Sequence, residues 1–210
     1  MKIAVVGATG NIGSRTVDAA LGAGHEVVAY VRRPEAVQAR DHLTVVKGAI
    51  DDVPALTTTI EGADAVIVAI TGPSSQADFM QTAMPSIVAA MQQSSAARLV
   101  LVSAFGSGDT ADKASWFMRL IYRSVLGKFM ADKAASEKLL VGSGIDYTIV
   151  YPVNLKDAPA RPAVTVKPLA EVAKVPGLPT LPFANVAQAL VDIAEHPTAT
   201  GSRLLITTAK

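Results

Sequence analysis

The chain begins with MKIAVVGATGNIGSRTV, residues 1–17, and the segment GATGNIG at 7–13 decides the fold. The apolar run IAVV at 3–6 comes just before this segment and is typical of a strand buried on both faces. Apolar residues at helical spacing follow it, two glycines end that pattern, and a second apolar run comes at 27–31. The segment therefore lies in a strand–helix–strand unit, the setting that a phosphate-binding glycine loop requires.

Each glycine of this loop has a separate physical role. Gly7 allows a sharp turn off the strand, Gly10 allows the backbone to approach a pyrophosphate, and Gly13 allows the helix to pack closely on the strand. The N–H groups at the start of the helix attract anionic phosphate, and two polar side chains beside them can add hydrogen bonds. The cofactor-binding residues predicted for this loop are Gly7, Thr9, Gly10, Asn11 and Ile12.

The other apolar runs predict the fold class. They lie at 43–46, 65–70, 99–103, 147–151 and 204–207, with helical segments between them. This alternation predicts one Rossmann-like, doubly wound α/β domain over 1–210, with a mostly parallel sheet, helices on both faces and a small C-terminal cap region. Six of the twelve prolines lie between Ala158 and Pro182. We therefore expect 155–183 to be a folded, substrate-side loop region with a short strand or two.

Composition excludes several classes of function. The 210 residues are 50% hydrophobic, carry a net charge of +1 and include no cysteine, which excludes disulfides, thiolate metal sites and cysteine nucleophiles. Neither a membrane-spanning run nor a signal-peptide pattern is present, and the charge does not favour nucleic acid. We expect a soluble, cytoplasmic monomer or homodimer that binds neither nucleic acid nor membranes. The three histidines have no metal-ligand spacing, so we expect them at the surface and expect no metal.

The end of the second strand indicates which dinucleotide binds. Arg32 and Arg33 stand there, and no acid does. An NAD site favours Asp or Glu for the ribose hydroxyls, whereas the planar, permanently charged guanidinium suits the 2′-phosphate of NADP. We therefore predict NADP(H) in preference to NAD(H), with Arg32 as the first contact and Arg33 as the second. The alternative is a solvated basic turn.

Two later turns are also predicted to lie near the cofactor. Ile50 follows the third strand and can wall the adenine. Asp51 either supplies a carboxylate at the adenine edge, or Asp51 or Asp52 caps a helix that begins near Val53. At the end of the fourth strand, we expect three residues near the nicotinamide ribose and the bridging phosphates: Ile70, Thr71 and Gly72.

The GATGxxG spacing at the N-terminus resembles the atypical short-chain dehydrogenase/reductase superfamily. The nearest likeness is to its NAD(P)H-binding, NmrA-like branch, which includes the flavin reductase/biliverdin reductase B type. The segment SGIDYTIVYP at 143–152 is similar to the strand that enters the active site in this family, with Tyr151 in the place of an arginine. The resemblance implies that Pro152, Val153 and Asn154 pass beside the nicotinamide, that Tyr151 is also a cofactor contact, and that Ser103 has the position of the catalytic serine.

The resemblance also implies a departure from the superfamily's Tyr-x-x-x-Lys motif. Phe129 stands where the tyrosine belongs, four residues before Lys133. Phenylalanine cannot donate a proton, so we expect no alcohol–ketone chemistry of the usual type. Lys133 either holds the nicotinamide ribose or forms a surface pair with Glu137. Ser103 either donates a proton or hydrogen-bonds the cofactor or acceptor. Ser103 and Lys133 are the candidate catalytic residues, and both are also candidate cofactor contacts.

These residues favour an NADPH-dependent oxidoreductase that transfers hydride to a small planar acceptor such as a flavin or quinone. Phe105, Phe129 and Asn154 are predicted to contact the acceptor. The aromatic residues that could supply a flat apolar surface are Phe105, Trp116, Phe117, Phe129 and Tyr151. A non-catalytic NADP(H)-sensing regulatory protein, similar to NmrA, is the alternative. A sugar-nucleotide epimerase or dehydratase is a weaker alternative, because the tyrosine is missing and the C-terminal region is short.

Overall fold

The computed structural model describes residues 1–73, 75–124 and 126–209. Ten strands are formed by these residues: β1 (Lys2–Val6), β2 (Glu26–Val31), β3 (Leu43–Lys47), β4 (Ala65–Val68), β5 (Leu99–Val102), β6 (Tyr147–Pro152), β7 (Asn154–Lys156), β8 (Val164–Pro168), β9 (Thr180–Pro182) and β10 (Ser202–Thr208). Eight of them make one sheet in the order β3-β2-β1-β4-β5-β6-β10-β8. Neighbours are parallel except β8, which runs antiparallel to β10. The predicted strands and the mostly parallel sheet are confirmed.

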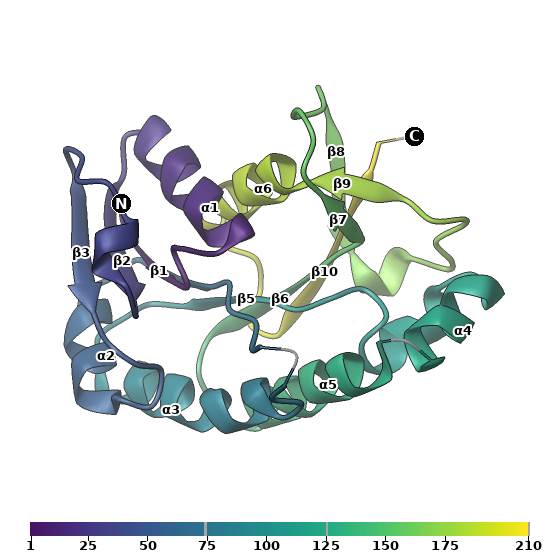
Figure 1. Ribbon diagram of the computed structural model, residues 1–210, viewed down its shortest axis with the longest axis horizontal. Coiled ribbons are helices and arrows are strands. Elements are labelled where there is room, and N and C mark those ends of the chain that lie inside the picture. Colours follow the sequence, from purple (N-terminus) through teal and green to yellow (C-terminus); the bar gives the residue numbers. More distant parts are fainter. Residues whose placement is uncertain (74, 125, 210) are drawn as a thin grey trace.

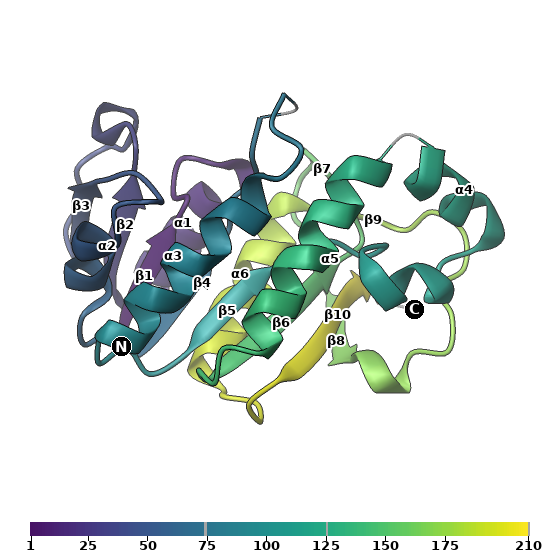
Figure 2. The ribbon, with the colours of Figure 1, turned by 90° about the horizontal axis from the view of Figure 1, so that it is seen from below.

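Helices cover both faces of this sheet (Figure 1). The α-helices are α1 (Asn11–Gly22), α2 (Val53–Ile60), α3 (Phe79–Gln93), α4 (Trp116–Ser124), α5 (Gly127–Val141) and α6 (Phe183–Glu195), with 3-10 turns η1 (Pro34–Ala36), η2 (Gly108–Lys113) and η3 (Leu169–Glu171). Helices α1 and α6 pack together on one face, and α2, α3 and α5 lie on the other. Figure 2 shows this second layer in front of the sheet, with α4 beyond α5 at one end.

The central strands explain why the sequence shows unbroken apolar runs rather than alternation. Every residue of β4, β5 and β6 is buried, because each of these strands has helices over both of its faces. The two faces of a strand then carry the same kind of side chain. The core is therefore continuous across the sheet, and the polar groups of a ligand site have to come from the loops at the strand ends.

The strand order reverses between β1 and β4. From β1 the chain moves outward to β2 and β3, and then returns to add β4 on the other side of β1. In open α/β sheets, ligands bind outside the carboxyl ends of the strands at such a reversal. Here those ends lead into Gly7 and Ala69, which are held to the neighbouring strands by Gly7 N–H to Tyr30 O (3.2 Å) and Ala69 N–H to Val6 O (3.0 Å).

The proline-rich region 155–183 has more regular structure than the expected strand or two. Strands β7 and β9 pair in parallel as a small separate sheet, while β8 extends the edge of the main sheet. Lys113 Nζ donates to the carbonyl of Val172 at 2.6 Å, and Ala114 forms an isolated bridge with Val175. The region is thus fastened to the η2 segment at the end of the domain.

Helix α3 runs continuously through Pro85. Its first turn is held from another helix. The Asp132 carboxylate of α5 accepts from the backbone N–H groups of Met80 (2.9 Å) and Gln81 (3.0 Å). Among the described residues, no helix combines the length and apolar character needed to cross a bilayer.

Candidate functional site

The glycine loop is packed so closely that only hydrogen fits at two of its positions. Gly7 has φ +91°, and a Cβ there would lie 2.7 Å from the carbonyl oxygen of Ala69. A Cβ at Gly13 would lie 2.2 Å from the carbonyl oxygen of Gly7. The loop therefore brings the first turn of α1 directly over the ends of β1 and β4.

The start of α1 is open to an anion. Gly10 is the residue before helix α1. The first turn of the helix has no acidic residue, and none of the described side chains caps the helix start. The first N–H groups of a helix have no intrahelical partner and lie at the positive end of its dipole. This uncapped helix start, with glycines where side chains would block access, fits the pyrophosphate of a dinucleotide.

Two clefts meet at this loop. One, of about 500 Å³, extends over the ends of β2 and β3, and the other, of about 460 Å³, extends over the ends of β4, β5 and β6. The residues that line both are Gly10, Ala69, Ile70 and Thr71. The clefts thus form one trough that crosses the glycine loop. We call its two halves the adenosine cleft and the acceptor cleft.

The adenosine cleft is lined by Arg32, Arg33 and Ile50, as the sequence predicts, and also by Asp51. Both arginines are exposed. The neighbouring Asp52 has a structural role, because its Oδ1 accepts from Ala55 N–H at 3.1 Å and caps α2. The cleft therefore presents two guanidinium groups and one carboxylate beyond the ends of β2 and β3.

Tyr30 forms part of the floor of the adenosine cleft. Its hydroxyl donates to the carbonyl of Ala49 at 2.8 Å, and a Cβ on Gly48 would lie 2.0 Å from that hydroxyl. Burial, with Asp52 and Asp51 nearby, raises the pKa of Tyr30 to about 12. The phenol therefore stays neutral and fixes the loop that carries Ile50.

The acceptor cleft brings together most of the predicted catalytic and substrate residues. Apolar side chains dominate its lining, with a few polar groups among them. The predicted residues that line it are Gly10, Asn11, Ile12, Ile70, Thr71, Ser103, Phe105, Phe129, Lys133, Pro152, Val153 and Asn154. An apolar cleft with few polar groups is typical of a small-molecule site and suits a planar ring.

Lys133 is buried at the wall of the acceptor cleft, with 2% of its surface exposed. Its Nζ donates to the carbonyls of Ile70 and Val102, both at 3.1 Å, and lies 5.9 Å from the centre of the Phe129 ring. Burial lowers the pKa of Lys133 to about 8, against the opposing effect of Asp132 and Glu137. The interpretation of Lys133 and Glu137 as a surface pair is wrong, because both residues are buried.

Glu137 is the centre of a buried hydrogen-bond network that sequence reasoning missed. Its Oε1 accepts from the hydroxyls of Ser103 and Ser107, the second at 2.7 Å, and its Oε2 accepts from Tyr151 at 2.8 Å. Arg203 Nε donates to the same Tyr151 hydroxyl at 3.0 Å. The carboxylate has three hydroxyl donors, which is what a buried charge needs in order to be tolerated.

Arg203 connects this network to the surface. Its guanidinium makes two hydrogen bonds to Asp109, at 2.8 and 2.5 Å, and its Cζ lies 5.2 Å from the centre of the Tyr151 ring. The pKa of Asp109 is lowered, chiefly by the hydrogen bond from Arg203. Burial and Glu137 raise the pKa of Tyr151, so its phenol remains protonated.

Several predicted residues lie elsewhere. Tyr151 is fully buried beneath the acceptor cleft and does not line it. Gly72 is outside both linings, because it packs on Phe79. Trp116 is 79% exposed and Phe117 52% exposed on α4, and neither lines the cleft. His25 is buried with its Nε2 2.8 Å from a carboxylate oxygen of Glu195, so its expected surface position is wrong.

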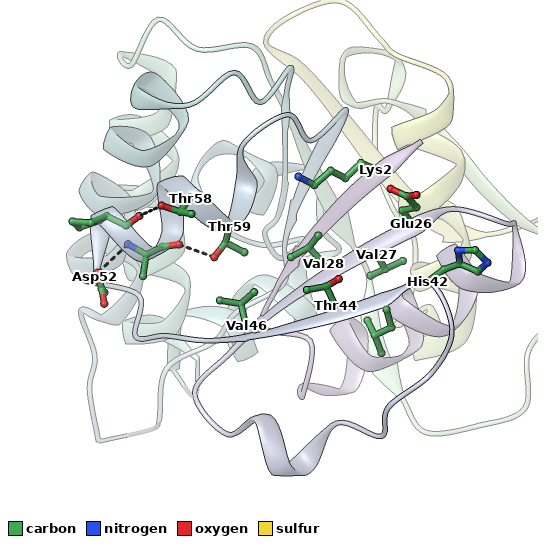
Figure 3. Close-up of a pocket in the computed structure, with 13 residues that line it drawn as sticks. Lys2, Glu26, Val27, Val28, His42, Thr44, Val46, Asp52, Thr58 and Thr59 are labelled. Carbon is green, nitrogen blue, oxygen red and sulfur yellow. Dashed lines mark hydrogen bonds between the residues drawn. The ribbon is translucent and has the colours of Figure 1, made fainter.

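A hollow of about 920 Å³ lies between α2 and the strands β2 and β3 (Figure 3). The polar side chains that α2 contributes to it already have partners within that helix. Thr58 and Thr59 donate to helix carbonyls and Asp52 caps the helix. Lys2 Nζ donates to the carbonyl of Glu61, just after α2, while Glu26 and His42 lie at the other end of the groove, away from Thr58 and Thr59. We assign no ligand to this groove, and place the site at the trough.

The reversal in strand order, the glycine loop and the trough across it define a Rossmann-type dinucleotide-binding domain. The sequence model of the NAD(P)H-binding family matches residues 7–197. The chain therefore belongs to the NAD(P)H-binding family, as the resemblance implied. A curated relative, an uncharacterised chloroplastic protein of Arabidopsis thaliana, is 27% identical over 178 residues, or 80% of this chain. The match spans 64% of that relative's length.

Solved structures share the whole architecture. A putative NADH-flavin reductase of Streptococcus pneumoniae has a TM-score of 0.83 at 20% identity, with full coverage of both chains. An anaerobilin reductase of Escherichia coli has a TM-score of 0.80 at 21% identity, covering 98% of this chain and 96% of its own. A short-chain dehydrogenase/reductase of Veillonella parvula in complex with NADP has a TM-score of 0.79 at 19% identity, covering 98% and 93%. At these identities the likeness establishes the fold.

Proposed function

We propose that the protein is an NADPH-dependent oxidoreductase that passes hydride to a small planar acceptor such as a flavin or quinone. The observation that carries this proposal is the shared lining of the two clefts at Gly10, Ala69, Ile70 and Thr71. A dinucleotide whose pyrophosphate lies on the start of α1 would extend from one cleft into the other. Its reactive ring would then lie in the apolar half, where an acceptor can stack against it.

Residues of both clefts have assigned parts in this binding. Arg32 and Arg33 would pair with the 2′-phosphate, and Ile50 would wall the adenine. Lys133 has three N–H donors, of which carbonyl groups take two, so one remains for a ribose hydroxyl at the cleft wall. The bound cofactor would supply the hydride, while the protein supplies position and electrostatics.

The residues around the ring favour an acceptor that needs little acid assistance. Phe129 lines the cleft where a proton-donating tyrosine would stand in the resembling superfamily, and the Ser103 hydroxyl donates to Glu137. Flavins and quinones accept hydride and then take a proton from water. The Streptococcus pneumoniae protein described as a putative NADH-flavin reductase shares this fold, which is consistent with the proposal.

A non-catalytic NADP(H) sensor is the second candidate, and one observation favours it. Helix α4 exposes three large apolar side chains, Trp116, Phe117 and Leu120, between 52% and 79% of their surfaces. Contiguous exposed apolar residues often mark an interaction surface. The sensor would bind NADPH as tightly as the reductase, without consuming it.

The test of the proposed function is a steady-state assay of NADPH oxidation by the purified protein, with FMN and a simple quinone as parallel acceptors and NADH as the comparison. The proposal expects turnover with at least one acceptor and a preference for NADPH. NADPH binding without turnover on either acceptor would favour the sensor. Equal rates with NADH and NADPH would contradict the assignment of Arg32 and Arg33 to the 2′-phosphate.

A further inference from the structure

We propose that Ser103 and Glu137 form a hydrogen-bond acceptor site in the acceptor cleft, which selects a ligand group carrying an amide-type N–H. Such a group is found in the imide of a flavin, in a lactam and in a carboxamide. The inference rests on the proposed function for the identity of the cleft. It concerns the direction of one hydrogen bond, that of the Ser103 hydroxyl, and that direction follows from the network behind it.

The direction is fixed from the far end of the network. A guanidinium can only donate, so Arg203 Nε donates to the Tyr151 hydroxyl, which must use its own hydrogen elsewhere. That hydrogen goes to Glu137 Oε2 at 2.8 Å. Arg203 is itself held by two hydrogen bonds to Asp109, so this end of the network cannot turn round.

At the cleft end of the network, the hydrogen bonds also run toward Glu137. Glu137 Oε1 accepts from Ser103 and from Ser107, so all three of its hydroxyl partners point their hydrogens at the carboxylate. A serine hydroxyl has one hydrogen and two lone pairs. Since the Ser103 hydrogen is used by Glu137, the oxygen can offer only lone pairs to the acceptor cleft, which Ser103 lines.

This polarity has a consequence for ligand choice. The polar atoms of a quinone are carbonyl oxygens, which cannot donate to a lone pair. An imide or lactam N–H can, and a site built to pair with a ligand hydrogen rejects the analogue that lacks it. The same N–H chemistry has two sources in this cleft, the hydride acceptor and the carboxamide of the nicotinamide. The experiment therefore needs an arm for each.

The experiment measures dissociation constants of two ligand pairs that differ at one N–H. Riboflavin is compared with 3-methylriboflavin, and NADP+ with its 3-acetylpyridine analogue, whose methyl ketone replaces the carboxamide. Each ligand is titrated against the wild-type chain and the variants Ser103→Ala, Glu137→Gln and Ser107→Ala. Ser107 is the matched control, because it donates to the same Glu137 oxygen and contacts the Ser103 hydroxyl at 3.3 Å but does not line the cleft.

The wild-type protein is expected to bind the N–H ligand of one pair about tenfold more tightly than its analogue. The pair that shows this preference identifies the source of the N–H. Ser107→Ala should keep the preference, Ser103→Ala should reduce it to about twofold or less, and Glu137→Gln should reduce or reverse it, because an amide N–H can turn the serine hydrogen toward the cleft.

A preference that persists in Ser103→Ala would overturn the inference, because the added methyl group would then be acting by size. Equal affinities within both pairs in the wild-type protein would also overturn it. If Glu137→Gln does not fold, the comparison of Ser103→Ala with Ser107→Ala still decides. A preference for the N–H ligand without NADPH turnover would support the acceptor site and contradict the reductase proposal. NADPH turnover without that preference would support the reductase proposal and contradict the acceptor site.

Discussion

Arg203 Nε on β10 lies 3.0 Å from the hydroxyl of Tyr151 on the neighbouring strand β6. The resemblance noted in the sequence implies an arginine at the position of Tyr151, and here a guanidinium comes instead from the adjacent strand. Through Tyr151 this cation stabilises Glu137, whose carboxylate would otherwise lie buried with fewer donors. The contact thus links β10 to the hydrogen-bond network behind the acceptor cleft.

Removing the hydroxyl that joins these two residues should destabilise the fold. In Tyr151→Phe, Arg203 and Glu137 both lose a buried hydrogen-bond partner, so the free energy of unfolding should fall by about 1–3 kcal/mol. Urea unfolding of the variant measures this change. Tyr147→Phe, on the same strand, is the control and should cost less than about 0.5 kcal/mol. Equal costs for the two variants would show that the Tyr151 hydroxyl has no special part.

The glycine loop gives a second pair of variants. In Gly13→Ala the new Cβ would lie 2.2 Å from a backbone oxygen, so the loop must shift, and we expect a loss of about 1–3 kcal/mol together with weaker NADPH binding. A Cβ at Gly22, at the other end of α1, would meet no described atom within 4 Å. Gly22→Ala should therefore be neutral or stabilise by up to about 1 kcal/mol. Thermal unfolding and NADPH titration of both variants test the contrast.

The arginines of the adenosine cleft should discriminate between the two dinucleotides. The double variant Arg32→Ala, Arg33→Ala should bind NADPH about tenfold or more weakly than the wild-type protein, and NADH less than about threefold more weakly. Arg40→Ala is the control, since Arg40 pairs with Asp18 at 2.6 Å and lies outside the cleft lining. Calorimetric titration of both dinucleotides gives the ratio. Similar losses for NADPH and NADH would rule out a 2′-phosphate contact.

Lys133 should give the protein a pH-dependent stability. Burial lowers its pKa from 10.5 to about 8, so between these values the unfolded chain binds a proton that the folded protein does not. The free energy of unfolding should therefore rise with pH, by up to about 2 kcal/mol between pH 8 and 9.5, relative to Lys133→Met. Below about pH 8 both states are protonated and this slope should vanish. A variant that shows the same rise would contradict the assignment to Lys133.

The series of unfolding measurements should end near pH 9.5, because tyrosines with an ordinary pKa of about 10 begin to ionise above this pH. Tyr30, with its pKa raised to about 12, acts in the opposite direction there: the unfolded chain loses its phenol proton first, so stability falls. Comparison with Lys133→Met at each pH cancels this contribution.

The sequence predicts the central strands and the turn at the strand reversal well, because the signals for these elements are local. Apolar runs of four to six residues correspond to the buried central strands, and the three glycines of 7–13 fix the turn at the strand reversal. Asp52 capping α2 follows from the same local chemistry. The residues at strand ends come together in one trough because parallel strands end at the same edge of the sheet.

The network behind the cleft could not be predicted in this way. Lys133 and Glu137 are four residues apart and so share a helix face, but the spacing does not say whether that face meets water or the sheet. Arg203 lies 52 residues from Tyr151, and only the pairing of β10 with β6 brings them together. Asp132 holds the start of a different helix, α3, and no local pattern indicates that contact.

In the proposed reaction, hydride leaves NADPH in the trough and reaches a planar acceptor there. The most direct measurement is a single-turnover experiment without oxygen, in which stoichiometric protein, NADPH and FMN are mixed and both absorbances are followed. We expect NADPH to disappear and FMN to be bleached at one common rate, and deuterium at the transferred position of NADPH to slow both. Stable NADPH bound to the protein, with FMN and a quinone both left oxidised, would contradict it.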